Sequence, residues 1–576
     1  MQTSKNLLKY YFSKPGIFVA LLLGILFLQA VLSMRQKSAT FDEPNYLPAA
    51  YSYLVTRELR MEPAQPPLAK LIYGIPLLLL NLKDPRDVPS WQMPKGARYA
   101  DEYKFGIDFL YHSGQDADKI LFLGRISSVL ISLLLGFWLF YWATQLYGSK
   151  SGYFALFLYV FSTDIIAHSQ LVTADIAISC LTLITMYYFW RFQKNPSNTN
   201  LLICGICLGA ALLIKHSALI LIPAFLILTY INQLLRKNKS YELEKSLFSL
   251  FKKNKVLYPL RNVLFITIIA LFIVWVGYGF EYNPLLVANK SHPSAELLLE
   301  RYFPKAMIPN LINLSEKIPV PFPSFFTGLA AIRAPRRDTF LMGRHFFGAP
   351  WYGYLVAFLI KTQIPFLVFL VVNLFALLKK RVPGEQGWGI LSVPILVFFI
   401  FSSFARFGLN LKYLLPVYPL LFVFTSQIVN QRFMRQILFK PIFIFLCLWY
   451  IFGCINIYPH YLAYFNEFVG GPKNGYKYLT DSNLDWGQDL KLLKQYLVKN
   501  NIRTIKLAYF GTADPAYYSI GYQKLEPFNS TAGWVAVSVT YLQGVHTAKG
   551  GYDWLKKYAP VANIGYSIFV YNIKTP

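Results

Sequence analysis

The feature that most constrains the fold of this chain is a series of apolar runs of about 20 residues, bounded by lysine and arginine. The first covers residues 16–33. Hydrophobic residues make up 55% of the 576-residue chain, and charged residues only 15%. Runs of this length cross a bilayer as helices, because a helix satisfies its own backbone hydrogen bonds in lipid. The sequence therefore predicts an α-helical multi-pass membrane protein.

The distribution of positive charge predicts how the chain crosses the membrane. The formal net charge is +28, and Lys and Arg concentrate in short loops between apolar runs. This pattern marks cytoplasmic loops and argues against nucleic-acid binding. It predicts about eleven transmembrane helices in the cell (plasma or inner) membrane, with the N-terminus cytoplasmic and the C-terminus extracytoplasmic. Two long loops, residues 34–118 and 279–349, then face the extracytoplasmic side.

The composition changes after residue 457, which ends the predicted transmembrane domain of residues 1–457. The runs "TIKLAYF", "WVAVSVT" and "YSIFVYNI" are typical of strands, while "DWGQDLKLLKQYLVKN" and "YDWLKKY" have helical patterns. We therefore expect residues 458–576 to form a small extracytoplasmic α/β domain.

Ionisable residues gather on the predicted extracytoplasmic face. Asp42 and Glu43 follow the first span, where polar groups are costly unless they serve a function. Pro66 and Pro67 predict a short helix from Leu68 that lies along the membrane surface and carries Lys70 in its first turn. The other candidates on this face are Glu62, Asp164, His168, Asp175, Lys215, His216, Arg333, Arg336, Arg337, Arg344 and His345.

Carboxylates beside cations at a membrane surface suit one kind of chemistry. A carboxylate takes a proton from an acceptor hydroxyl, and cations hold a leaving phosphate that is anchored in lipid. Other roles stay open: Asp42 and Glu43 also fit a helix cap, and Lys215 fits a side chain that reaches toward the interface. A divalent metal held by Glu62 and a histidine is a further alternative, although no close ligand spacing supports it.

Several motifs together resemble the phospholipid-carrier-dependent glycosyltransferases of family 39, the group of protein O-mannosyltransferases and aminoarabinose transferases with a GT-C fold. The motifs occur in the family's order: "TFDEPNYLPAAYSYL", "EPAQPPLAKL", "LVTADIAIS", "LLIKHSAL", "FLMGRHFFGAPWYGYLVAFLIKTQIP" and "LKYLLPVYPLL", with Ala69 and Lys412 replacing the usual Gly and Arg. "YFNEFVGGPKNGYKYLTDSNLDWGQDLKLL" is similar to a signature of bacterial members with a C-terminal outer domain.

The resemblance implies a polyprenyl-phosphate sugar donor, an acceptor on a protein, lipid or glycan, and inversion at the anomeric carbon. It implies Asp42 as the catalytic base, with Glu43 beside it, and Glu62 and Asp175 as further acids of the site. It also implies that Lys70 contacts the carrier phosphate, where Lys215, His216, Arg344 and His345 are further candidates. The His-Pro-Pro-Leu pattern of the protein mannosyltransferases is absent, since Gln65 stands in its place.

The sequence therefore predicts an integral membrane glycosyltransferase that needs no nucleotide cofactor, because no phosphate-binding glycine loop is present. A lipid or glycan transporter or flippase is the main alternative. Transporters tend to show internal repeats and sites near the midplane of the bilayer, and neither pattern is evident here. A non-catalytic scaffold that binds envelope polymers is another. The sugar, the acceptor, the metal requirement, the role of the C-terminal domain and the oligomeric state are not decided by the sequence.

Overall fold

The structure is a computed structural model, which describes residues 14–92, 99–235, 257–285, 304, 307–333, 338–378, 388–404, 408–431, 436–437 and 439–575. The basic loop at 236–256, the first lysines of the chain, Arg336 and Arg337 lie outside the described residues, as does the side chain of Arg333. The predictions that concern these residues are therefore untested.

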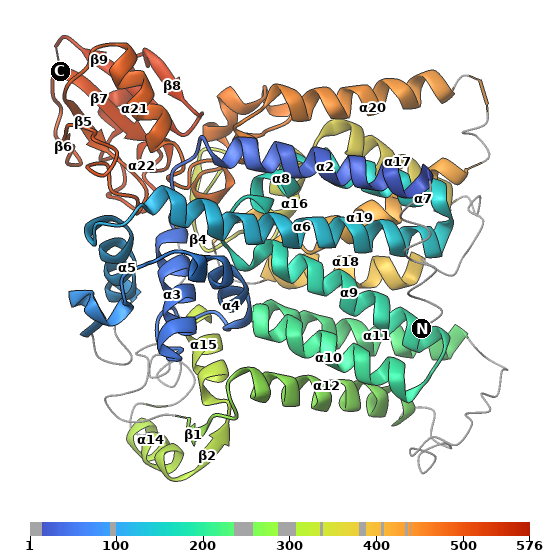
Figure 1. Ribbon diagram of the computed structural model, residues 1–576. Coiled ribbons are helices and arrows are strands. Elements are labelled where there is room, and N and C mark those ends of the chain that lie inside the picture. The colour runs from blue at the N-terminus through green and yellow to red at the C-terminus, as the bar shows by residue number, and fades with distance from the viewer. Residues whose placement is uncertain are drawn as a thin grey trace.

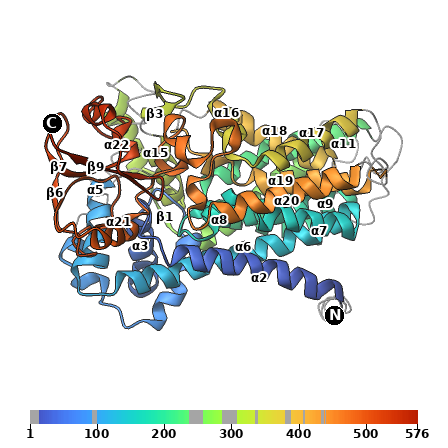
Figure 2. The same ribbon diagram turned by 90° about the horizontal axis from the view of Figure 1, so that it is seen from above.

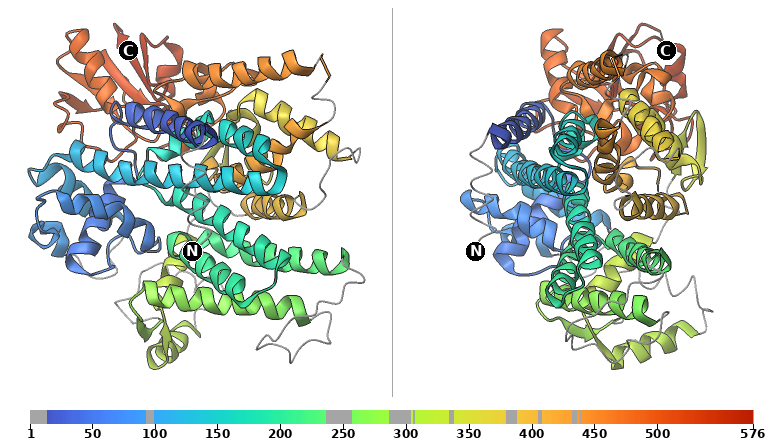
Figure 3. Two further views of the ribbon diagram at one scale, coloured as in Figure 1. Left: turned by 45° about the vertical axis from the view of Figure 1, so that its right-hand side comes forward. Right: turned by 90° about the vertical axis from the view of Figure 1, so that its right-hand side faces the viewer.

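The apolar helices form a bundle, and Figure 3 (right) shows many of them nearly end-on. The helices of this bundle are α2 (Lys14–Met34), α6 (Ala117–Tyr147), α7 (Ser149–Val160), α8 (Thr163–Ser169), α9 (Ala174–Lys194), α10 (Asn198–Ile214), α11 (Leu221–Leu235), α12 (Leu257–Gly277), α16 (Gly353–Lys361), α17 (Ile364–Leu378), α18 (Trp388–Phe404), α19 (Val417–Ser426) and α20 (Phe439–Asn456).

Among the described residues, five helices are long and apolar enough to cross a membrane: Gly16–Met34, Ala117–Tyr147, His216–Leu234, Leu260–Gly277 and Phe439–Asn456. Two further pairs, α8 with α9 and α16 with α17, pass the same test together but bend by 116° and 115°. Counting each pair as one span gives up to 7. The multi-pass helical class is thus confirmed, while the predicted number of about eleven spans is not. The bend between α8 and α9 falls where the sequence predicts an outer turn.

Glycines allow two helices of the bundle to approach closely. A Cβ on Gly205 or Gly209 of α10 would lie 2.7 Å and 2.6 Å from Ile269 and Ile273 of α12. Small residues four positions apart are a common means of packing helices tightly in membranes, where dispersion contacts replace the hydrophobic effect. The "LLICGICLGA" stretch is therefore a packing surface, as its apolar character indicates.

A second group of elements covers one end of the bundle (Figures 1 and 2). It contains α3 (Glu43–Thr56), α4 (Leu68–Gly74), which continues as a 3-10 turn over Ile75–Leu79, and α5 (Tyr99–Ile107). The second long loop adds α14 (Ile308–Lys317), α15 (Pro323–Arg333), and two antiparallel hairpins, β1 (Tyr282–Pro284) with β2 (Pro319–Pro321), and β3 (Asp338–Leu341) with β4 (Arg344–Phe347).

The C-terminal part of the chain lies at this same end, opposite the start of α2 (Figures 1 and 2). Its strands form one sheet in the order β6-β5-β7-β9-β8, in which β5 pairs in parallel with β6 and β7. The strands are β5 (Ile505–Ala508), β6 (Tyr522–Lys524), β7 (Gly533–Ser538), β8 (Ala562–Ile564) and β9 (Ile568–Ile573), with helices α21 (Leu490–Lys499) and α22 (Val539–Leu542). The three runs predicted as strands become β5, β7 and β9, so the α/β prediction is confirmed.

Candidate active site

Asp42 lies at the start of α3, with its carboxylate between a tyrosine and a lysine. Its Oδ1 accepts a hydrogen bond of 3.0 Å from the Tyr103 hydroxyl, and its Oδ2 lies 3.1 Å from Lys412 Nζ. Asp42 occupies the N-cap position but makes no side-chain cap hydrogen bond. Its side chain is 24% exposed. Helix capping therefore does not explain this residue, and its carboxylate is accessible.

Distant parts of the chain bring these two partners to Asp42. Tyr103 belongs to α5, which crosses the first turn of α3 so closely that a Cβ on Gly106 would lie 1.8 Å from the Pro44 carbonyl oxygen. Lys412 belongs to a 3-10 turn over Leu411–Leu414, and its Nζ lies 3.9 Å from the centre of the Trp486 ring. The lysine is thus held between an acid and an aromatic face.

Glu43 has a different environment from its neighbour. It is fully buried, and both of its carboxylate oxygens bind Arg125, at 2.8 Å and 2.6 Å. The Thr40 and Val172 amides donate to it as well, at 2.8 Å and 3.0 Å. Burial raises the pKa of Glu43, but the Arg125 charge and these donors outweigh burial, so the net pKa is lowered. Glu43 therefore holds elements together instead of facing a ligand.

Glu62 and Lys70 form a buried pair of their own. Lys70 Nζ lies 2.5 Å from Glu62 Oε2 and also donates to the Glu62 and Gln65 carbonyls at 2.5 Å and 2.8 Å. The expected helix begins at Leu68, but Lys70 is 0% exposed and points into the protein. We expected this helix to lie along the membrane surface and to present Lys70 there. The expectation is wrong for the Lys70 side chain, because its ammonium is satisfied by an ion pair inside the fold.

Glu102 of α5 adds a further acid beside this pair. Burial, and next the charge of Glu62, raises the pKa of Glu102 to about 8. Burial also raises the pKa of Glu62 to about 7, although Lys70 opposes the rise. Both carboxyls therefore lose their protons at a higher pH than a solvated glutamate does.

Asp175 and Lys215 form the third acid–lysine pair, with Asp175 Oδ1 2.6 Å from Lys215 Nζ. Asp175 lies in the first turn of α9. Lys215 is the C-cap residue of α10, where the sequence predicts a turn. Lys215 Nζ also lies 5.0 Å from the centre of the Tyr413 ring, next to Lys412 in the chain. His216 turns elsewhere: its Nε2 donates to the Phe325 carbonyl at 2.9 Å.

The phenol of Tyr46 marks where the acids meet. Tyr46 is buried in α3, and its pKa is raised well above the ordinary value by burial and then by the charges of Glu62, Asp42 and Asp175. Lys70 Nζ lies 5.9 Å from the same ring. Three of the predicted acids, Asp42, Glu62 and Asp175, are thus close enough to act on one side chain, and each has its own lysine.

Of the remaining candidates, His168 lies close enough to Asp175, Lys412 and Lys215 for their charges to interact, and the others have different neighbours. Arg344 and His345 are exposed on β4, where His345 lies next to Gly544 in the C-terminal segment. Burial and the nearby Lys549 lower the pKa of His345. Asp164 and His168 are buried at α8. Within the described parts of the chain, no group of three or more His, Cys, Asp or Glu side chains is arranged to hold a metal ion, and Glu62 faces Lys70 instead of a histidine.

Four residues of the cluster were not among the predicted site residues. Lys412 had a signal, since it stands at a basic position of the "LKYLLPVYPLL" motif. Tyr46 lies within the Asp42 motif, but its helix face looks apolar in the sequence. The sequence therefore does not show that Tyr46 lies among the acids. Tyr103 and Glu102 carry no motif and reach the site only because α5 packs on α3.

Comparison with known proteins finds one family model that matches part of the chain. Residues 118–251 match the model of the dolichyl-phosphate-mannose-protein mannosyltransferase family. This segment runs from α6 through α11 and includes Asp175 and Lys215. No curated protein is significantly similar in sequence to the whole chain. The match supports, over this segment, the resemblance that the motifs indicate.

Several solved structures are similar to the chain. ArnT from Cupriavidus metallidurans bound to undecaprenyl phosphate is 11% identical, with 97% of this chain and 98% of that chain covered and a TM-score of 0.46. The oligosaccharyltransferase of Archaeoglobus fulgidus in the apo form is 11% identical (96% and 73% covered, TM-score 0.41). The Pmt1-Pmt2 complex of S. cerevisiae bound to the sugar donor is 15% identical (46% and 34% covered, TM-score 0.34). At these identities a shared substrate does not follow.

Proposed function

We propose that this protein transfers a sugar from a polyprenyl-phosphate carrier to an acceptor hydroxyl on the extracytoplasmic face of the membrane, with inversion at the anomeric carbon. The observation that carries the proposal is the accessible Asp42 carboxylate, held by Tyr103 and Lys412 beside two further acid–lysine pairs. Carboxylates that accept a proton and cations that accept a phosphate are the two parts that this reaction requires.

Asp42 is the proposed base. Its carboxylate would take the proton of the acceptor hydroxyl as the oxygen attacks the anomeric carbon, and the bond from that carbon to the phosphate oxygen would break. Asp42 suits this role because its side chain is 24% exposed and its partners, Tyr103 and Lys412, leave lone pairs on both carboxylate oxygens. Glu43 cannot replace it, since Arg125 and backbone amides enclose it.

The lysines supply the charge for the leaving phosphate. Lys412 and Lys215 are each 11% exposed at the side chain, whereas Lys70 is completely enclosed. An anionic phosphate would compete with Asp42 for Lys412 and with Asp175 for Lys215. Binding of the donor would then release the Asp42 carboxylate from its ion pair at the moment when a base is needed. Lys70, through its ion pair with Glu62, would keep the loop that carries Glu62 in place beside the Asp42–Lys412 and Asp175–Lys215 pairs.

The orientation of the chain is part of the proposal. Residues 1–457 would form the transmembrane glycosyltransferase domain and residues 458–576 an extracytoplasmic domain. The start of α2 and the C-terminal sheet lie at opposite ends of the bundle, which supports a cytoplasmic N-terminus and a site on the other side (Figure 1). A polyprenyl phosphate would reach the cluster from the bilayer surface.

The proposal is tested by mass spectrometry of envelope glycans and glycoproteins from a strain that lacks the protein. We expect a sugar modification to disappear, wild-type protein to restore it, and Asp42→Asn not to restore it. Lys412→Met should reduce the product by about 10²-fold, as loss of one electrostatic contact in an active site typically does. Lys473→Met, at an exposed lysine, is the matched control and should restore it fully.

Three results would contradict different parts of the proposal. Normal product with Asp42→Asn would remove Asp42 as the base. A deletion strain with unchanged envelope glycans, glycoproteins and glycolipids would remove glycosyl transfer itself. Labelling of a cysteine at position 42 by an impermeant reagent only after the cells are broken would contradict the orientation.

A further inference from the structure

The segment of residues 480–490, "TDSNLDWGQDL", belongs to the C-terminal part of the chain but contacts the stretch that leads to Asp42. The Phe41 amide donates to the Trp486 carbonyl at 2.8 Å, and the Ser38 amide donates to the Gln488 carbonyl at 3.0 Å. In return, the Leu490 amide donates to Ser38 Oγ at 3.1 Å. Segment 480–490 therefore fixes the backbone immediately before the proposed base.

The same segment fixes the turn that carries Lys412. Asn483 Oδ1 accepts from the Leu411 amide at 2.9 Å, and its Nδ2 donates to the Leu409 carbonyl at 2.6 Å. The Trp486 ring lies against the Lys412 ammonium at 3.9 Å. Asn483 and Trp486 are nearly completely buried. One short segment thus contacts Lys412 and the stretch that leads to Asp42, although Asp42 and Lys412 are 370 residues apart in the chain.

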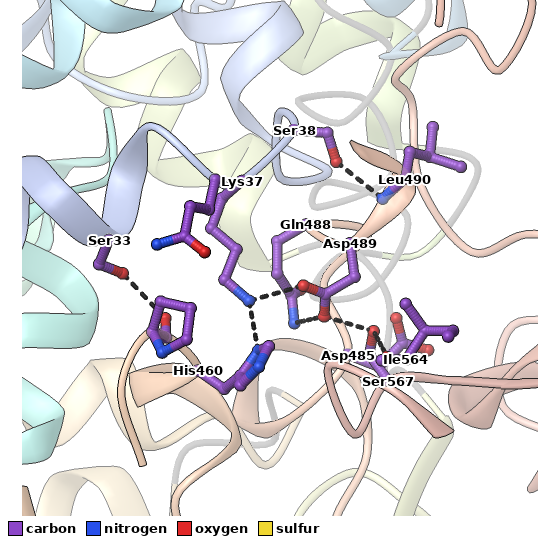
Figure 4. A network of polar contacts seen from close by, with 12 residues as sticks. Ser33, Lys37, Ser38, His460, Asp485, Gln488, Asp489, Leu490, Ile564 and Ser567 are labelled. Atoms are coloured by element: carbon purple, nitrogen blue, oxygen red, sulfur yellow. Dashed lines mark hydrogen bonds and ion pairs between the residues drawn. The ribbon is translucent and has the colours of Figure 1, made fainter. Parts of the chain in front are cut away.

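Buried polar and charged side chains bind segment 480–490 to the end of α2, to the end of α20 and to the C-terminal sheet (Figure 4). Asp489 accepts from Lys37 Nζ at 2.6 Å and from Ser567 Oγ at 2.6 Å, and Lys37 Nζ lies 2.7 Å from His460 Nδ1. A Cβ at Gly565 would lie 2.3 Å from Asp489 Oδ2, so only glycine leaves room for this carboxylate. These bonds join the end of α2, the end of α20 and the sheet. The segment is consequently rigid, which a positioning element requires.

We infer that segment 480–490 positions the Asp42–Lys412 pair, with Asn483 and Trp486 as positioning residues, and that the C-terminal domain is thereby part of the catalytic apparatus. The inference rests on the proposed function. Its physical basis is that a base and a cation on separate, flexible turns would each sample many positions, whereas transfer needs them within a fraction of an ångström. Hydrogen bonds from one buried segment to both turns remove that freedom.

The first test compares two asparagines of the same part of the chain. Asn483→Ala removes both bonds to the Lys412 turn, while Asn500→Ala removes one exposed bond within α21 and serves as the control. Each variant is assayed for product in the complemented deletion strain, at matched protein levels. Purified protein is assayed for thermal stabilisation by vesicles that contain undecaprenyl phosphate. We expect Asn483→Ala to lose about 10- to 100-fold of the product and to keep the stabilisation, and Asn500→Ala to lose neither.

The second test uses the Trp486 ring, in case Asn483→Ala fails to fold. Trp486→Phe keeps an aromatic face under Lys412, and Trp486→Leu replaces it by an aliphatic group. We expect the phenylalanine variant to restore most of the product and the leucine variant to restore little, at equal melting temperature. A merely structural role would make the two variants equally active at equal melting temperature.

The outcomes separate this inference from the proposed function. If Asp42→Asn abolishes the product while folded Asn483→Ala or Trp486→Leu makes it at the wild-type level, the positioning role is wrong and the base stands. If Asp42→Asn makes normal product, the proposed function fails, whatever the other variants do. Loss of the stabilisation by undecaprenyl phosphate in folded Asn483→Ala would also overturn the inference, because the segment would then serve donor binding.

Discussion

Asp42 and Glu43 are adjacent in the chain but lie in opposite environments. The Asp42 carboxylate is 24% exposed and faces Lys412 at 3.1 Å, whereas Glu43 is 0% exposed and sits in the fork of Arg125. The two acids therefore differ in what their loss should do, although their sequence context is the same. Under the proposed function, Asp42 acts on a ligand, whereas Glu43 holds the fold.

Asp42→Asn should reduce transfer by at least about 10²-fold and leave the melting temperature nearly unchanged, because a general base contributes 10²- to 10⁴-fold and its ion pair is partly solvated. Glu43→Gln should instead destabilise the protein by about 3–5 kcal/mol, since it leaves Arg125 buried and uncompensated. Thermal unfolding in detergent, with product measured in parallel, checks both. Equal melting temperatures for the two variants would contradict the assignment.

The Glu62–Lys70 pair should show strong coupling in a double-mutant cycle. Lys70→Met leaves Glu62 buried without its partner and should lower the melting temperature markedly. The double variant Glu62→Gln/Lys70→Met should recover part of that loss, because it removes the unpaired acid. Additive effects of the single variants would show that the two side chains do not interact.

Gly106 should tolerate no side chain. In Gly106→Ala the new methyl group would meet the Pro44 carbonyl oxygen, so α5 must shift and move Tyr103 away from Asp42. We expect a lower melting temperature and a loss of transfer. Gly24→Ala, in α2 with nothing within 4 Å of its Cβ, is the matched control and should behave as wild type. Wild-type transfer by Gly106→Ala would mean that α5 does not cross α3 as described.

Stability should fall as the pH rises from about 5 to 8. The pKa of Glu102 is raised from 4.5 to about 8, so the folded state keeps a proton that the unfolded state has already released. The stabilisation by this proton is complete below pH 4.5 and is lost as the pH rises through about 8. Glu102→Gln, which stays neutral, should flatten the decline in melting temperature over this range. An unchanged slope in that variant would contradict the shift.

The sequence was sufficient to predict the class of the fold but not the number of membrane spans. The apolar runs and basic loops were sufficient to predict the helical membrane class, and the alternation in "WVAVSVT" and "YSIFVYNI" was sufficient for two strands of the sheet. The distribution of basic residues was also sufficient to predict turns at residues 162–175 and at Lys215. The number of spans did not follow from the sequence, because several apolar helices are short or sharply bent, and length alone does not show how they cross the bilayer.

The role of each acid could not be predicted, because ion pairing depends on residues far away in the chain. Nothing near Lys70 in the sequence shows that the side chain turns inward to Glu62, and nothing near Glu43 shows that Arg125 will enclose it. Arg344 and His345 were grouped with the site by topology, yet they lie on a hairpin beside Gly544.

The sequence by itself determined the multi-pass helical class and singled out ionisable groups that gather at one end, because the cost of burying charge in lipid acts on every residue locally. Only the tertiary structure decided which acid meets which cation. That choice depends on short-range contacts between segments such as 38–42, 409–412 and 480–490, which become neighbours only when the helices have packed.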